Sequence, residues 1–344
     1  MRKISKRNSL IIVLILVFLV SLTSLSFAHE EMVEGEYYTL LDENKKVIHY
    51  SGLRVHVGDE YINADNERYK VVELDGNKAK CKYVGKEKMP TIKAPKSAWG
   101  INFKNPLVPV TKGEDKTIAV YVTHSDESYI PGDGTESISG EGGIYDVANA
   151  FAERLKAHGF KVVFSDNNHN PHDIYAYDRS RKTASSLLKD NPVAIFDVHR
   201  DAIPANMYSS NVKGKDVTKI KLVVGRTNPN SNSNLEFAKK IKVAMDEKKA
   251  GLSNGIFLGK GDYNQDLSPR AMLIEVGAHE NDKEAAIEGA KQFADVIPLV
   301  VGVTETNKNT GENKNAATTI VIILLILAFT IAGFYFINKA PSNG

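Results

Sequence analysis

Three ionisable residues lie at or near the carboxyl ends of apolar stretches, which is where open α/β sheets carry their chemistry. His124 follows the apolar run at 117–123, His199 follows the run at 193–198, and Glu275 lies in the run at 272–276. The carboxyl ends of strands in an open α/β sheet form the edge at which ligands bind, so these side chains are predicted to share one site. Two histidines and a carboxylate form a ligand set for Zn²⁺ that leaves the fourth position open for water.

The third ligand has several candidates near His124. They are acidic residues in and after the following loop: Asp126, Glu127, Glu136 and Glu141. Zinc polarises a carbonyl and brings the pKa of bound water towards ~7, and a nearby glutamate can take the proton of that water. Glu275 is the candidate for this general base. The residues therefore predict metal-assisted hydrolysis.

Composition and motifs argue against the competing classes of chemistry. The single cysteine, Cys81, excludes an intramolecular disulfide and a thiolate cluster, so a metal must be held by His, Asp and Glu. The glycine-rich stretch at 130–143 has neither the Lys-Ser/Thr of a P-loop nor the GxGxxG order, and there is no Gly-x-Ser-x-Gly elbow. With 44 basic and 42 acidic residues, a net charge of +2, the chain is not predicted to bind nucleic acid.

The elements that must position the site alternate between strands and helices. Strands are predicted at 117–123, 160–164, 193–198, 220–224 and 272–276, and helices at 144–155, 182–188, 234–245 and 283–297. This order predicts an α/β fold with an open, mostly parallel sheet and helices on both faces. Before it, short strands at 37–41, 46–50, 53–57, 69–74 and 79–84 predict a small all-β module.

The two ends of the chain carry targeting signals. Residues 1–28 combine a basic start, an apolar run and a small-residue end, which predicts a signal peptide or, alternatively, an uncleaved anchor. Residues 316–337 are uncharged over a length that spans a bilayer, so a transmembrane helix is predicted, with a buried core helix as the alternative. The remaining divisions are a β module at 30–85, a linker at 86–115, a catalytic domain at 116–303 and a linker at 304–315. Most of the chain is expected outside the cytoplasm, anchored in the cell membrane.

The motifs, in this order, resemble the SpoIIP family of sporulation proteins, whose catalytic domain is similar to zinc-dependent N-acetylmuramoyl-L-alanine amidases. The resemblance covers about residues 117–303, and its most specific parts are His-Arg-Asp at 199–201 and Glu-Val-Gly at 275–277. The matching segments are YVTHSDESY at 121–129, DIYAYDRS at 173–180, DVHRD at 197–201, NPN at 228–230, NLEFA at 234–238 and IEVG at 274–277.

The resemblance implies an extracytoplasmic peptidoglycan hydrolase that removes stem peptides from glycan strands and also cleaves within the peptide. It implies SpoIID-like and SpoIIM-like partners at the septum during engulfment. His124 and His199 match the metal-binding histidines of amidases, and Glu275 matches their catalytic glutamate. The His-Thr-His of the family is Val-Thr-His at 122–124, and the glutamate that opens the first helix of amidases has no clean counterpart. Glu127 or Glu141 must replace it.

Further residues are candidates for contact with the substrate. His169 and His172 lie in the loop after the strand at 160–164, and Arg200 directly follows His199. Arg200 or Arg270 could bind a stem-peptide carboxylate through two hydrogen bonds, as could Arg179. The alternative to an enzyme is a non-catalytic peptidoglycan-binding or scaffold protein of the engulfment machinery.

Overall fold

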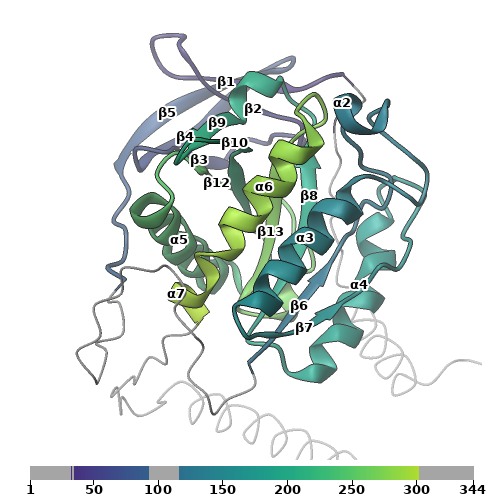
Figure 1. Ribbon diagram of the computed structural model, residues 1–344. Coiled ribbons are helices and arrows are strands. Elements are labelled where there is room, and N and C mark those ends of the chain that lie inside the picture. Colours follow the sequence, from purple (N-terminus) through teal and green to yellow (C-terminus); the bar gives the residue numbers. More distant parts are fainter. Residues whose placement is uncertain (1–31, 33–34, 93–115, 302–344) are drawn as a thin grey trace, which may run out of the picture. The chain divides into compact units, whose positions relative to one another are not determined.

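The computed structural model describes Met32 and residues 35–92 and 116–301 (Figure 1). The predicted signal segment at 1–28 and the predicted transmembrane helix at 316–337 lie outside these residues, as does most of the linker predicted at 86–115. Within the described part of the chain, no helix is both long enough and apolar enough to cross a membrane.

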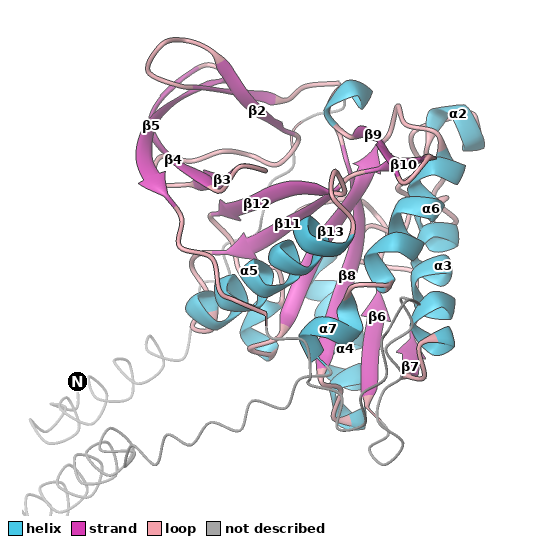
Figure 2. Cartoon of the chain, turned by 60° about the vertical axis from the view of Figure 1, so that its left-hand side comes forward, coloured by secondary structure: helices cyan, strands magenta, loops and turns pink. Residues whose placement is uncertain are grey.

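One eleven-stranded sheet organises the described residues (Figures 1 and 2). Its strand order is β2-β1-β5-β4-β3-β12-β11-β13-β8-β6-β7, and β9 and β10 form a separate hairpin. The strands are β1 (Tyr38–Leu41), β2 (Val47–Ser51), β3 (Glu60–Ile62), β4 (Glu67–Asp75), β5 (Lys78–Lys86), β6 (Thr117–Tyr121), β7 (Lys161–Phe164), β8 (Ala194–Asp201), β9 (Ser209–Val212), β10 (Lys215–Thr218), β11 (Ile220–Gly225), β12 (Ser253–Gly259) and β13 (Ala271–Ala278).

The predicted α/β arrangement of strands and helices is confirmed, but the sheet is mixed rather than mostly parallel. In the segment from β12 to β7 only the pair β11 and β13 is antiparallel. The strands predicted as an N-terminal β module extend this same sheet, because β3 pairs antiparallel with β12, matching Tyr61 with Phe257. Antiparallel pairs among β1 to β5 then make the whole sheet mixed.

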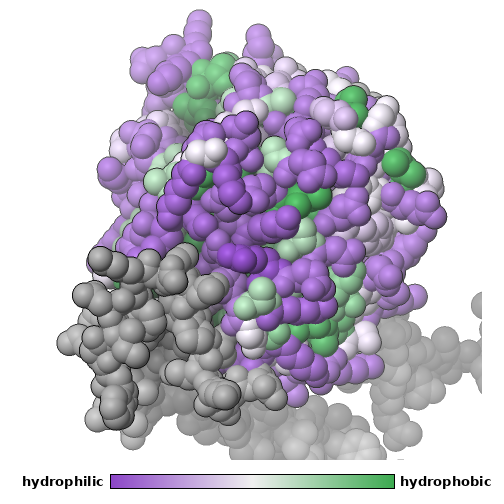
Figure 3. All heavy atoms as spheres, viewed as in Figure 1, coloured by the Kyte–Doolittle hydropathy of each residue, from purple (hydrophilic) through white to green (hydrophobic). Residues whose placement is uncertain are grey.

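Helices cover one face of the sheet along most of its α/β part. Buried side chains of α3, such as Val147, Phe151 and Leu155, recur at helical spacing and pack on strand residues such as Phe196. The outer residues of α3 and α6 make the hydrophilic surface seen in Figure 3. The helices are α2 (Ile130–Asp133), α3 (Ile144–Ala157), α4 (Ala176–Leu187), α5 (Ser231–Lys248), α6 (Lys283–Ala294) and α7 (Ile297–Val301), and short 3₁₀ turns lie at Leu188–Asp190, Ala205–Met207 and Gln265–Leu267.

The second face has two different covers. At the β6 and β8 end, Ala184 of α4 packs on alternate strand residues such as Tyr121 and Ile195. At the other end, the cover is the N-terminal strands, whose buried side chains form one cluster with Val223 and Leu273. Their side chains thus bury part of the face that helices cover in a doubly wound sheet.

An ion cluster joins the C-terminal ends of α3, α5 and α6. Asp295, which follows α6, accepts hydrogen bonds from Arg154 Nε at 2.6 Å and Lys249 Nζ at 2.8 Å, and its Oδ1 lies 2.9 Å from His158 Nε2. Burial alone would raise the pKa of Asp295, but these three contacts hold it well below its usual range. The predicted helix at 283–297 therefore ends at this cluster, and α7 starts after it.

Candidate functional site

Alternation along β8 places three polar side chains on the second face of the sheet. Phe196 and Val198 point into the helix-covered core, while Asp197, His199 and Asp201 point the other way, and all three are buried. Glu275 on β13 is the register partner of His199, so the two side chains lie next to each other on that face. The ends of these two strands therefore lie side by side in the structure, as predicted.

Two histidines and one glutamate form a compact buried group at this edge. One nitrogen each of His124 and His199 and one carboxylate oxygen of Glu127 all lie within 4.8 Å of one another. Glu127 Oε1 is 3.1 Å from His124 Nδ1 and 3.3 Å from His199 Nδ1. The rings of the two histidines are perpendicular, with centroids 4.8 Å apart. Both histidines thus present Nδ1 to the same carboxylate oxygen.

The donor set fits a zinc ion. Zinc–ligand bonds of ~2.0–2.1 Å in tetrahedral geometry separate neighbouring ligand atoms by about 3.3 Å. The two distances to Glu127 Oε1 match this spacing. Three protein ligands of N, N, O type leave one position for water or substrate, which is the arrangement of catalytic rather than structural zinc sites.

A carboxylate behind His199 fixes the orientation of its ring. Asp197 Oδ1 lies 3.1 Å from His199 Nε2, and so leaves Nδ1 to face Glu127. Asp197 is itself held by Thr123, whose backbone N–H donates to Oδ1 at 2.9 Å and whose hydroxyl donates to Oδ2 at 2.6 Å. Metal-binding histidines commonly have such a carboxylate on the second ring nitrogen, because it fixes the tautomer and raises ligand basicity.

Backbone contacts in the loop at 125–143 hold Glu127 in place. Glu127 pairs with Ser137 in an isolated β-bridge, and its carbonyl accepts from the backbone N–H of Ile144 at 3.0 Å. Its second carboxylate oxygen accepts from the backbone N–H of Arg200 at 2.8 Å. Gly142 packs so closely that a Cβ there would lie 2.3 Å from the Glu127 carbonyl oxygen. The glycine-rich stretch is therefore a tightly bonded support of the site.

The charges within the site are strongly coupled. Burial alone would raise the pKa of Glu127, but His199, His124 and Arg200 outweigh it and lower this pKa to about 2. Burial opposes a charge on His199, yet the carboxylates of Asp197 and Glu127 hold its pKa well above the usual range. A metal ion at this position would therefore displace a proton from His199, as metal binding to histidine generally does.

Glu275 has the opposite electrostatic character. Burial, together with the neighbouring Asp201 carboxylate, raises its pKa to about 8, against the influence of Lys221 and His199. Among the described residues its Oε2 has no hydrogen-bond partner. A carboxyl group that gains and loses a proton near neutral pH is suited to general acid–base catalysis.

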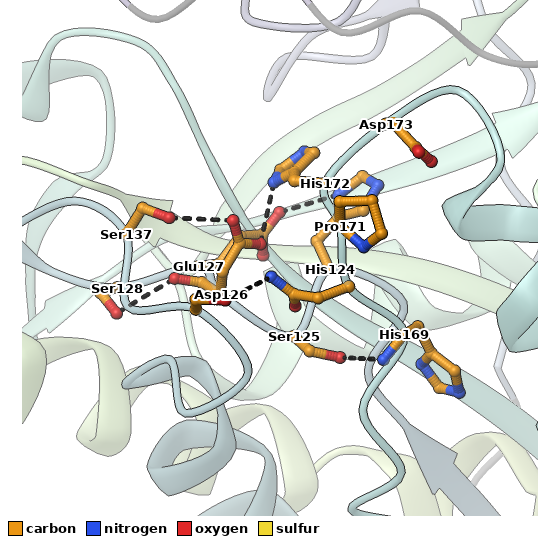
Figure 4. A network of polar contacts seen from close by, with 12 residues as sticks. His124, Ser125, Asp126, Glu127, Ser128, Ser137, His169, Pro171, His172 and Asp173 are labelled. Carbon is orange, nitrogen blue, oxygen red and sulfur yellow. Dashed lines mark hydrogen bonds and ion pairs between the residues drawn. The ribbon is translucent and has the colours of Figure 1, made fainter.

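His172 adds another imidazole to the site, and Figure 4 shows it near Asp126 and His124. Its ring stacks on His124 with centroids 3.9 Å apart, and its Nδ1 lies 3.0 Å from Asp126 Oδ1. Ser137 donates to the other oxygen of Asp126 at 2.9 Å. The His172 side chain is 26% exposed, so it lies between the buried ligands and solvent.

The side chains of the other predicted site residues do not join this ligand group. Glu141 is exposed and lies outside the ligand set. The guanidinium of Arg200 donates to the carbonyls of Ser128 and Glu136, so it supports the loop. Arg270 precedes β13, at the end of the strand opposite to Glu275, and its carbonyl accepts from the N–H of Ile195 at the start of β8.

The His169 side chain also makes contacts that support the fold. Its Nδ1 lies 2.8 Å from the carbonyl oxygen of Val122, and its Nε2 lies 2.8 Å from the hydroxyl of Thr183. Because a carbonyl only accepts, Nδ1 carries the proton and Nε2 accepts from Thr183. Both ring nitrogens therefore bond within the fold.

Sequence reasoning missed three polar residues of the site: Asp197, Asp201 and Lys221. The signal was available, since each lies in or beside an apolar strand buried on both faces, where a charged side chain needs a partner.

Fold and site together define a class: an α/β protein with a buried His-Glu-His group at the carboxyl ends of its strands, suited to a catalytic divalent metal. The chain belongs to the Stage II sporulation protein P (SpoIIP) family, whose family model matches residues 29–298. A relative in Bacillus subtilis (strain 168), "Stage II sporulation protein P", is 29% identical over 224 residues. That match covers 59% of this chain and 56% of the relative, so the chain spans little more than half the length of that protein.

Solved structures of amidases are similar to part of this chain. The CwlD amidase from Clostridioides difficile, in complex with the GerS lipoprotein, is 15% identical with a TM-score of 0.37, covering 54% of this chain and 95% of that one. Ami1 from Mycobacterium smegmatis is 19% identical with a TM-score of 0.35, covering 54% and 94%. AmiC2 of Nostoc punctiforme is 16% identical with a TM-score of 0.34, covering 55% and 96%.

Proposed function

We propose that this protein is a zinc-dependent N-acetylmuramoyl-L-alanine amidase that remodels peptidoglycan during sporulation. The observation that carries the proposal is the buried group of His124, Glu127 and His199, with Glu275 beside it. A non-catalytic binding protein would have no need of a buried ligand set with an open fourth position next to a carboxyl group that titrates near neutral pH. Membership of the SpoIIP family supports the substrate, and endopeptidase cleavage within the stem peptide is the second activity we propose.

Zinc held by the three ligands would supply a Lewis acid that polarises the scissile amide and lowers the pKa of water. The protein supplies the proton transfers. Glu275 takes the proton of the attacking water and delivers it to the nitrogen of the leaving peptide, because its Oε2 has no hydrogen-bond partner within the part of the chain that the structure describes. Asp197 and Glu127 keep the two histidines oriented throughout.

His172 is our candidate for contact with the substrate. It is partly exposed, and its ring is fixed by stacking on His124 and by Asp126. Arg179 holds the loop that carries it, donating to the carbonyl oxygens of His169 and Pro171 and to Asp173. Because such a loop is already ordered, it can orient a bound peptide without a further loss of its own conformational entropy.

We also propose that the protein is anchored in the cell membrane with most of the chain outside the cytoplasm, where its substrate lies. This rests on the apolar segments at 1–28 and 316–337. SpoIID-like and SpoIIM-like proteins are the proposed partners, on the ground of the family relationship alone.

The test is digestion of purified sacculi by the full chain in detergent, with mass spectrometry of the released products. We expect free stem peptides, loss of turnover with a chelator and its return with zinc. His124→Ala, His199→Ala and Glu275→Gln are each expected to lower kcat by at least 10²-fold.

Glu141→Gln is the matched control, because it removes an exposed glutamate of the same loop and is expected to keep full activity. Full activity in the three site variants would contradict the proposal. Binding to sacculi with no product from the wild type and no bound zinc would favour the non-catalytic alternative.

A further inference from the structure

An ion pair spans the strand that carries Glu275. Lys221 lies on β11 and Asp201 on β8, and β13 runs between these two strands. Lys221 Nζ nevertheless donates to Asp201 Oδ2. The register pairs Glu275 with His199 on one side and with Lys221 on the other. Neighbouring strands are about 4.8 Å apart, so the Lys221 side chain reaches over β13, beside Glu275.

Both members of the pair are removed from water and have fixed positions. The side chains of Lys221 and Asp201 are 0% and 1% exposed. The Asp201 carboxylate also accepts from the Tyr208 hydroxyl at 2.8 Å, from the backbone N–H of Ala202 at 2.8 Å and from that of Gly52 at 3.2 Å. Gly52 lies just after β2, so the N-terminal strands help to hold this carboxylate.

Stability alone does not account for the pair. Removing two charges from water costs as much as their attraction returns, and apolar residues of similar size commonly serve a fold equally well. This pair places a fixed positive charge beside a buried glutamate whose Oε2 has no hydrogen-bond partner among residues 35–92 and 116–301.

We propose that Lys221 and Asp201 are positioning residues for Glu275. The ammonium group attracts the Glu275 carboxylate and confines it between Lys221 and His199, and Asp201 prevents the ammonium group from moving with it. The inference rests on the proposed function, since it assigns to Glu275 the proton transfers of that reaction.

The test is the double variant Lys221→Met with Asp201→Asn, in the full chain. Asparagine still accepts from Gly52 and Ala202 through Oδ1, and its amide nitrogen can donate to the Tyr208 oxygen. The variant therefore removes both charges and keeps the backbone contacts, although the Tyr208 hydroxyl proton loses its present acceptor. We expect bound zinc and KM for peptidoglycan to match the wild type, and kcat to fall about 10²-fold, the effect of a misplacement of about 1 Å. A crystal structure of the variant should have the Glu275 carboxylate turned away from His199.

The matched control is Lys242→Met with Asp246→Asn. Lys242 is also fully buried and donates to Asp246 at 2.7 Å, but it lies on α5 and its other partner is the carbonyl of Ala64. This control should keep wild-type kcat. Lys221→Gln, which keeps a hydrogen bond to Asp201 without the charge, gives a second variant should the double variant not fold, and its kcat should fall in the same way.

A folded, zinc-bound double variant with wild-type kcat, or with Glu275 unmoved in its crystal structure, would overturn the inference. So would loss of zinc together with loss of activity, because that pattern would make the pair part of the metal site. If the wild type releases no peptide, the proposed function fails, and the crystal structure alone then decides whether the pair positions Glu275.

Discussion

Replacing the carboxylate behind His199 tests the metal site without touching a ligand. Asp197→Asn keeps an oxygen for the backbone N–H of Thr123, which now donates to Oδ1 at 2.9 Å. It removes the negative charge 3.1 Å from His199 Nε2 and the acceptor of the Thr123 hydroxyl. The ring of His199 then loses basicity and one of the contacts that fix its orientation.

The expected effect is a 10- to 100-fold loss of zinc affinity, as found when the outer partners of metal-binding histidines are removed. That range corresponds to about 1.4–2.7 kcal/mol of binding free energy. The Thr123 hydroxyl keeps Ser180 Oγ as an acceptor at 2.9 Å, so the loss of zinc affinity is expected to come from the charge removed beside His199.

The measurement is a competition titration of metal-free protein against a chromogenic zinc chelator, followed by turnover at saturating zinc. Asp190→Asn, an exposed carboxylate beyond α4, is the control and should leave affinity unchanged. Zinc affinity within threefold of the wild type would refute the reasoning that Asp197 orients a metal ligand.

Three further predictions concern the supports of the fold and the site. Asp295→Asn should cost about 2 kcal/mol at neutral pH, limited by the 38% exposure of one partner, Arg154, and lower the melting temperature by about 4–8 °C. Because the pKa of Asp295 is lowered in the fold, its contribution is complete above the unfolded-state pKa near ~3.9 and is lost gradually as the pH falls towards the lower folded-state pKa. The difference in melting temperature should therefore begin to shrink only below about pH 4, and a difference independent of pH would contradict this. Gly142→Ala should displace Glu127 and abolish zinc binding in the same titration, whereas Ser139→Ala in that loop should bind normally. Gly52→Val should lower the melting temperature and turnover together, since its Cβ would lie 2.8 Å from Asp201 Oδ1; unchanged turnover would mean that the N-terminal strands do not support the site.

The sequence predicts the strand-end residues well, because periodicity marks where a buried strand stops. His124, His199 and Glu275 all follow from that rule, and the structure brings them to one edge. Choosing Glu127 over Glu141 needs the loop geometry, since both glutamates lie in a glycine-rich stretch whose path no pattern predicts. In the structure the β-bridge to Ser137 and the hydrogen bonds from the backbone N–H groups of Ile144 and Arg200 hold Glu127 at the site.

The residue patterns along the sequence did not predict two other strands, β12 and β3. β12 has the sequence SNGIFLG, whose small and polar start hides a fully buried strand, and the short β3 is stabilised by its neighbours rather than by its own propensity. The prediction of a small all-β module at 30–85 therefore omitted the pairing that joins β3 to β12. Such pairing depends on contacts between residues far apart in the chain.

That pairing has a consequence for how the molecule folds. Tyr61 of β3 donates from its hydroxyl to the carbonyl of Asn254, a residue 193 positions further along. A chain that emerges N-terminus first can pair its early strands with one another, but the outer edge of β3 stays unpaired until β12 arrives, and contacts of such long sequence separation slow folding. During that interval the open edge of β3 is exposed to other chains, so newly made protein is most prone to aggregate before β12 completes the sheet.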